Sequence, residues 1–397
     1  MRKLSAHYIF TGDGTVLRKG IIVLNDDLSI AAIIDTNGEL EEIAGVEFYS
    51  GVLTPGFVNA HCHLELSHLL GTFPEKTGLP DFLKNVVEYR NLEENRVLEA
   101  ARQADFQMWK NGIVAVGDIS NNRTTFALKS ESKIVYHTFI EALGFSSHRA
   151  ERAFEWAAIC YNEALKLGLA ASVVPHAPYS ISKELFDRIA AFAVRQRSIL
   201  SMHSQECAAE DDLYLSGNGE IVRHLTENLA IDMALFKPTG KSALESVIEW
   251  LPKEHQLLLV HNIRTTQNDI DLLMNTRKPG KTWFVLCPES NLYIENRLPD
   301  IELFRKNKLQ ICLGTDSLSS NRQLSLLEEM KSIQNHFPAI PFTELVTWAT
   351  RNGAQALEMD SWAGTIEVGK KPGINLISGM NLEHLQLLPQ SRVRWLI

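Results

Sequence analysis

Five histidines and two acidic residues stand where apolar runs of the sequence end. His61 and His63 follow the run at 53–58, and their spacing of two places both side chains on one face of a strand. The remaining five are His176, His203, Glu206, His261 and Asp316. Three neutral imidazoles and one carboxylate can hold a divalent ion and leave a position for water, which is typical of catalytic sites. Such an ion lowers the pKa of its water towards ~7.

Each of these residues also has an ordinary structural interpretation. A His-x-His pair can lie on the surface, Asp316 can cap a helix that begins near Ser317, and Glu206 can be a solvated carboxylate. The coincidence of metal-binding side chains at the ends of five separate runs favours the metal site. We therefore expect one divalent ion, with zinc as the first choice and iron or manganese as alternatives.

The elements that position these residues alternate between apolar runs and amphipathic stretches. The amphipathic stretches at 92–110, 149–167 and 183–195 predict helices. Eight runs predict parallel strands, at 53–58, 112–116, 134–140, 170–174, 199–202, 256–260, 283–286 and 309–313. This order predicts an α/β fold, a (β/α)8 TIM barrel over residues 53–363, in which chemistry is found at the carboxyl ends of the strands. A doubly wound sheet is the alternative, but no glycine fingerprint opens the first helix.

The two ends of the chain lack this alternation of strands and helices. Short strand-like runs occur at 21–24 and 30–34, and again at 365–368 and 375–377, with glycine-containing turns between them. We expect residues 1–52 and 364–397 to form together a small β-sandwich domain beside the barrel.

Composition excludes several classes of protein. The net charge of -9 and the lack of a Lys/Arg-rich run argue against a nucleic-acid partner. The longest apolar stretches fall short of the ~20 residues that span a membrane. Five scattered cysteines predict no disulfide framework and fit a reducing, cytoplasmic compartment. We expect a small-molecule substrate, and a homodimer is left open.

Six segments, in chain order, resemble the motifs of the amidohydrolase superfamily. They are Pro55 to His63, Pro175 to Ser180, His203 to Glu206, Val260 to Asn262, Cys287 to Asn291 and Leu313 to Ser317. Their combination resembles the clade that contains adenosine-type, guanine and cytosine-type deaminases and triazine chlorohydrolases. The chain differs from the family in its closing motif. The family has Gly-Lys-x-Ala-Asp-Leu, and residues 369–376 of this chain read Gly-Lys-Lys-Pro-Gly-Ile-Asn-Leu.

This resemblance implies a role for each of the seven residues. His61, His63, His203 and Asp316 would bind the metal, and Glu206 would carry protons. His261 and Asp316 would orient the attacking water, and His176 would contact the substrate ring. Relatives with two metals place a lysine at the end of the fourth strand, but residues 170–178 contain none. The resemblance therefore implies a single ion.

The substrate is indicated by a shorter signal. His63-Leu64-Glu65-Leu66-Ser67 resembles the aminodeoxyfutalosine deaminases of the alternative menaquinone pathway, which implies deamination of 6-amino-6-deoxyfutalosine. Alternatives are deamination of S-adenosylhomocysteine, adenosine or guanine, hydrolysis of a chlorinated triazine, and an inactive metal-binding scaffold. Four loop residues are candidate substrate contacts, namely Glu65, Asp81, Phe82 and Arg149. Glu65 could instead only pack its loop, and Arg149 could be a solvated residue at the start of a helix.

Overall fold

The computed structural model describes residues 2–40, 44–90 and 92–397. Eight parallel strands form two four-stranded sheets with the orders β6-β7-β8-β9 and β10-β11-β12-β13. Their bounds are β6 Phe57–Cys62, β7 Ile113–Ser120, β8 Val135–Ala142, β9 Ala170–Pro175, β10 Leu200–Ser204, β11 Leu257–His261, β12 Thr282–Leu286 and β13 Gln310–Leu313. These strands are buried along almost their whole length, which explains their continuous apolar runs.

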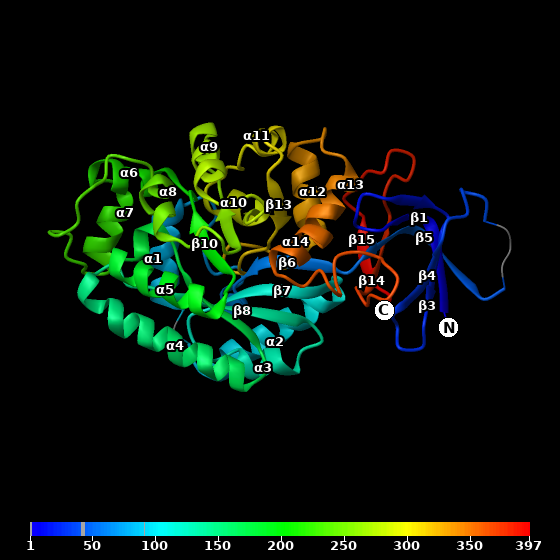
Figure 1. The fold of residues 1–397 in the computed structure, drawn as a ribbon, viewed down its shortest axis with the longest axis horizontal. Helices are drawn as coiled ribbons and strands as arrows, with labels where there is room; N and C mark the ends of the chain where they lie inside the picture. Colours follow the sequence, from blue (N-terminus) through cyan, green and yellow to red (C-terminus); the bar gives the residue numbers. More distant parts are fainter. Residues whose placement is uncertain (1, 41–43, 91) are drawn as a thin grey trace.

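Helices follow the strands and lie outside them (Figure 1). The α-helices are α1 Leu79–Tyr89, α2 Glu94–Lys110, α3 Phe126–Glu131, α4 Ala150–Lys166, α5 Lys183–Gln196, α6 Ala208–Ser216, α7 Glu220–Arg223, α8 Ala243–Val247, α9 Gln267–Thr276, α10 Pro288–Ile294, α11 Ile301–Lys306, α12 Leu326–His336, α13 Phe342–Thr347 and α14 Gly353–Ala356. Three short helical segments, η1 Leu64–Leu69, η2 Ser147–Arg149 and η4 His224–Asn228, also lie near the site. The three helices predicted from the sequence agree with α2, α4 and α5 to within two residues at each end.

Contacts join the two sheets at both edges. Cys62 of β6 forms a parallel bridge with Asp316, and the backbone N–H groups of Thr315 and Asp316 donate to the carbonyl of His61 at 3.0 and 3.1 Å. At the other edge, the backbone N–H of His203 in β10 donates to the carbonyl of His176 just after β9, at 2.9 Å. These contacts bring the carboxyl ends of the strands together, as the predicted barrel requires.

Strands from both chain ends share one mixed seven-stranded sheet, which lies at one end of the molecule beside both termini (Figure 1). Its strands are β1 Arg2–Phe10, β2 Val16–Arg18, β3 Ile21–Leu24, β4 Ile30–Ile34, β5 Val46–Pro55, β14 Ile374–Ser378 and β15 Arg392–Trp395. β14 pairs antiparallel with β5, so the last segment of the chain completes a sheet that the first segment begins. The recorded pairing joins these strands in one sheet, and a sandwich of two sheets stays a prediction. Residues 1 and 41–43 of the expected terminal domain lie outside the described residues.

Two strand predictions were wrong. The run at 53–58 does not form one strand, because residues 53–55 end β5 and the barrel strand begins at Phe57. Gly56 separates the two strands, and a Cβ there would meet the Val114 side chain at 2.3 Å and the Pro372 carbonyl at 2.6 Å. Residues 365–368 form no strand, since they lead into a turn that bonds back to Ile30.

All five cysteines are buried and unpaired. In the part of the chain that the structure describes, no helix combines the length and the apolar character needed to cross a bilayer.

Candidate metal centre and active site

The Nε2 atoms of three histidines converge at the carboxyl ends of β6 and β10. His63 Nε2 lies 3.1 Å from His61 Nε2 and 3.2 Å from His203 Nε2. The His203 Nδ1–H donates to the carbonyl of His176 at 2.9 Å, so its proton is on Nδ1 and its Nε2 carries a lone pair. Unprotonated ring nitrogens this close repel one another unless they share a cation or a proton.

Asp316 completes this cluster from the loop after β13. Its Oδ1 lies 3.4 Å from His63 Nε2 and 3.7 Å from His61 Nε2. Its Oδ2 accepts hydrogen bonds from the hydroxyls of Ser290 and Ser320, at 2.6 and 2.7 Å. One carboxylate oxygen is thus anchored while the other faces the imidazoles.

The protonation states suit a metal ion. Burial lowers the pKa of His63 and of His203 well below the usual value, so both rings are neutral, the form that binds metals. Burial opposes ionisation of Asp316, but its hydrogen bond to His61 and the nearby imidazoles hold its pKa well below the usual range. Two groups of three potential ligands overlap here, His61 with His203 and His261, and His61 with His63 and Asp316. The donor set therefore fits one divalent cation.

Glu206 and His261 face each other beside this cluster. Glu206 Oε1 lies 3.5 Å from His261 Nε2, and both side chains are buried. The His261 Nδ1 is 2.7 Å from Asn291 Oδ1, so Nδ1 carries the proton and Nε2 offers its lone pair to the site. Burial, with the charges of Asp316 and Glu295, raises the pKa of Glu206 well above the usual value. A protonated carboxyl that can donate therefore lies next to an imidazole that can accept.

The loops after three strands hold these side chains with strained backbone. Gln205, His261 and Asp316 have positive φ angles of 52°, 75° and 56°, a region that non-glycine residues seldom occupy. Gly314 comes just before this loop, where a Cβ would meet the His61 Cβ at 2.9 Å and its carbonyl at 3.0 Å. Such strain is found where surrounding contacts fix a functional geometry.

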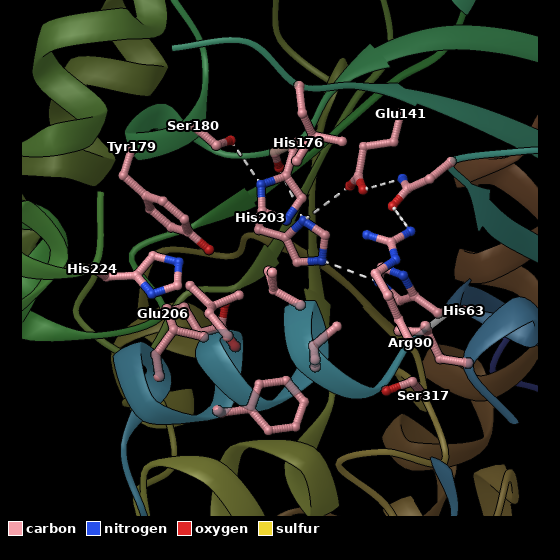
Figure 2. Close-up of a pocket in the computed structure, with 18 of the residues that line it drawn as sticks. His63, Arg90, Glu141, His176, Tyr179, Ser180, His203, Glu206, His224 and Ser317 are labelled. Atoms are coloured by element: carbon pink, nitrogen blue, oxygen red, sulfur yellow. Dashed lines mark hydrogen bonds and ion pairs between the residues drawn. The ribbon is translucent and has the colours of Figure 1, made fainter. Parts of the chain in front are cut away.

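A cavity of about 140 Å³ lies over the cluster (Figure 2). One wall is apolar and consists mainly of α1 and η4, with Leu79, Phe82, Leu83, Val86, Val87, Leu225 and Leu229. The cavity also reaches His63, His203, Glu206, His261 and Asp316, and a polar corner contains Arg90, Asn121 and Glu141. The site thus combines a large apolar surface with few polar groups, as ligand pockets do.

The structure brings some of the predicted substrate contacts to this cavity and not others. His176 lines it, with Nδ1 2.7 Å from the Ser180 hydroxyl, and Phe82 of α1 lines it as well. Asp81 is exposed on α1 and does not line it. Glu65 is buried and faces Arg90, which lies between it and the cavity.

Arg149 lies farther out. It is exposed and lines a second cavity together with Arg152 and Trp156. This second cavity shares Leu143, Ser180, Leu225 and Leu229 with the first, so the two adjoin.

Sequence reasoning missed several residues of the site. Arg90 and Asn121 line the cavity, and Glu210 accepts from the backbone N–H groups of Gln205 and Glu206, at 3.1 and 2.9 Å. Glu141 ends β8 and lies within ligand distance of His176 and His203. Glu141 follows the predicted strand at 134–140 and was the reserve candidate for a second metal ion, so it was not missed, whereas Arg90 and Asn121 carry no such signal.

Comparison with known proteins places this site in a family. The model of the amidohydrolase family matches residues 52–393, which include every element of the site. The chain belongs to the amidohydrolase family. Like the deaminases of this family, it is a hydrolase that acts on carbon–nitrogen bonds other than peptide bonds.

The similar proteins include two curated relatives and one solved structure, all three named as deaminases. The adenosine deaminase of Helicobacter pylori is 28% identical over 83% of this chain and 79% of its own length. The aminodeoxyfutalosine deaminase of Nitratiruptor sp. is 29% identical, with the same coverage. The crystal structure of Helicobacter pylori aminofutalosine deaminase in complex with methylthio-coformycin superimposes with a TM-score of 0.81 at 25% identity, and covers 96% of this chain and 93% of that one. That fold is of the TIM-barrel type, and this chain shares it.

Proposed function

We propose that this protein is a metal-dependent hydrolytic deaminase of an adenine-type nucleoside, with 6-amino-6-deoxyfutalosine as its first candidate substrate. The observation that carries the proposal is the pairing of Glu206 with His261 beside the histidine–aspartate cluster. The names of the relatives support the same substrate class. The reaction replaces the exocyclic amine by a carbonyl oxygen from water and releases ammonia.

The residues that would hold the metal are His61, His63, His203 and Asp316. A divalent ion, with zinc as the first choice and iron or manganese as alternatives, would lower the pKa of a water molecule and so provide the nucleophile. The fixed tautomer of His203 and the anchored oxygen of Asp316 leave His203 Nε2 and Asp316 Oδ1 facing His63 Nε2. We expect one ion per chain, because the nearby residues 170–178 contain no lysine.

Glu206 supplies the protons in this proposal. Its raised pKa keeps the carboxyl protonated near neutral pH, so it can protonate the ring nitrogen next to the carbon that carries the amine. The carboxylate then takes a proton of the attacking water and passes it to the amine, which leaves as ammonia. His261, with Nδ1 fixed on Asn291, accepts a hydrogen bond from the attacking water at Nε2. Protonation of the ring avoids the build-up of negative charge during attack.

The adjoining second cavity supports a nucleoside with a long 5′ substituent. Arg149 and Arg152 line it, and an arginine binds a carboxylate in a two-pronged geometry. Aminodeoxyfutalosine and S-adenosylhomocysteine both end in a carboxylate, and we propose that Arg149 contacts it.

A substrate panel tests the proposal. Ammonia release would be measured with aminodeoxyfutalosine, S-adenosylhomocysteine, adenosine, guanine and a chlorinated triazine, on protein with its metal content determined. We expect the carboxylate-bearing nucleosides to have the highest kcat/KM. Preference for guanine or the triazine would overturn the substrate class, and a loaded protein without activity on any of them would indicate a metal-binding scaffold.

A further inference from the structure

The three side chains of the polar corner, Arg90, Asn121 and Glu141, form one connected network with Glu65, which lies behind them. Arg90, just after α1, donates from Nη2 to Asn121 Oδ1 at 2.8 Å and lies 3.5 Å from Glu65 Oε1. The Asn121 backbone N–H donates to both oxygens of Glu65 at 3.2 Å, and its side-chain amide donates to Glu141 Oε2 at 2.7 Å. Figure 2 shows Arg90 and Glu141 on the same side of the cavity as His176.

Among the described residues, the second carboxylate oxygen of Glu141 has no hydrogen-bond partner. Glu141 Oε1 is buried, and its nearest recorded polar neighbour is His203 Nδ1 at 3.5 Å. The proton of that nitrogen already goes to the carbonyl of His176 at 2.9 Å. A buried acceptor without a donor is costly, so the geometry calls for a donor from a bound molecule.

The charges of the polar corner indicate what kind of group it takes. One guanidinium lies among two carboxyl groups, which is a poor site for an anion and offers both donors and acceptors. Both recorded bonds of the Arg90 guanidinium use Nη2, one of its three nitrogens. Neutral hydroxyls, which donate and accept, match this set.

We propose that the polar corner binds the vicinal hydroxyls of the substrate's sugar, with Glu141 as acceptor and Arg90 as donor. This inference rests on the proposed nucleoside deaminase function and names the residues that select the sugar. The adenine ring apart from its amine presents nitrogen acceptors, so the sugar hydroxyls are the donors that can satisfy Glu141.

The position along the chain agrees with this assignment. Glu141 lies at the end of β8 beside the histidines, Leu143 lines both cavities, and Arg149 lines the outer one. These residues follow one another from the metal centre outwards. A nucleoside with its ring at the metal centre would place its sugar at Glu141 and its 5′ substituent towards Arg149.

The test compares adenosine with 2′,3′-dideoxyadenosine in the wild-type protein and in Glu141→Gln. We expect the wild-type protein to favour adenosine by about 10- to 100-fold in kcat/KM, the usual worth of hydrogen bonds to a charged group. In Glu141→Gln this preference should shrink to about threefold or less, through loss on adenosine alone. Glu163→Gln, on the exposed side of α4, is the matched control and should keep the wild-type ratio. Arg90→Gln should also reduce the ratio.

Any of the following results would contradict the inference. An unchanged ratio in Glu141→Gln, or no preference in the wild-type protein, would overturn it while the deaminase function stands. Equal loss on both nucleosides, or loss of metal from Glu141→Gln, would show that Glu141 acts on His203 or on the ion instead. A loaded wild-type protein that deaminates neither nucleoside, nor any other in the panel, would overturn the proposed function as well.

Discussion

Glu206 is the residue whose surroundings define its chemistry most closely. It is buried, it faces His261, and its pKa is raised well above the usual value by burial first and by Asp316 next. Glu206→Gln keeps the size and polarity but removes the acid function. We predict that metal content is retained and that kcat falls by ~10²–10⁴, the usual worth of a positioned acid or base. Turnover and elemental analysis of the same preparation check this, and near-normal kcat would remove Glu206 from the mechanism.

The proposed ligands should behave differently from Glu206. His61→Ala or Asp316→Ala removes a member of the overlapping groups of potential ligands that share His61. We predict that each variant loses the metal and the activity together, whereas Glu206→Gln loses only activity. Metal stoichiometry after purification without chelator is the measurement, with about one equivalent expected in the wild-type protein. Full metal occupancy in either variant would contradict the assignment, and two equivalents in the wild type would reopen Glu141 as a ligand.

The sequence contained enough to predict which residues converge, because each follows a buried strand and parallel strands end on one side. The structure adds the contacts that determine the tautomer and protonation of these residues. One such contact is the Asn291 side chain, which fixes the tautomer of His261. Asp81 was expected at the substrate and lies exposed instead, while Arg90 on the same segment lines the cavity. The sequence does not reveal which residues of a loop face inwards, since that depends on how η1 and α1 pack.

At the scale of elements, a buried ion pair holds the start of η1, directly after His63. Asp118 of β7 accepts from the Leu64 backbone N–H at 2.7 Å and pairs with Lys129 of α3, and both charged side chains are fully buried. We predict that Lys129→Met destabilises the fold by about 3–5 kcal/mol, because it leaves Asp118 buried and unpaired. The urea midpoint, followed by circular dichroism, measures this.

A double variant provides the control for this pair. In Lys129→Met with Asp118→Asn no unpaired charge remains, and the asparagine oxygen can still accept from the Leu64 N–H. Most of the lost stability should therefore return. Equal destabilisation in the single and double variants would show that packing of the lysine chain, and not the charge, is what matters.

The strand pattern was predictable because a buried parallel strand is a continuous apolar run. Seven of the eight runs begin within one residue of a barrel strand, and the eighth, at 53–58, reaches only the first two residues of β6. The prediction of one strand at 53–58 was wrong because β5 and β6 are adjacent in sequence, with only Gly56 between them. Both halves are apolar and buried, so composition alone could not separate a strand of the terminal sheet from a strand of the barrel.

At the scale of the whole molecule, the proposed metal ligands come from distant parts of the chain. His61 lies in β6 with His63 just after it, His203 lies in β10 and Asp316 follows β13, so the two four-stranded sheets both contribute. An ion bound there links segments that separate when the protein unfolds, and it favours the folded state by mass action.

Metal removal should therefore lower the stability of the entire fold. At a free metal concentration about a thousandfold above Kd, binding contributes about 4 kcal/mol, and a strong chelator should remove this contribution and lower Tm by several degrees. Thermal unfolding of the wild-type protein with and without chelator measures the shift, and readdition of zinc should restore it. His61→Ala is the control: because it lacks a proposed ligand, its Tm should hardly respond to chelator or zinc. A wild-type Tm that is indifferent to chelator after verified metal loss would show that the ion does not link the two sheets, whereas an equal response in His61→Ala would place the stabilising ion elsewhere.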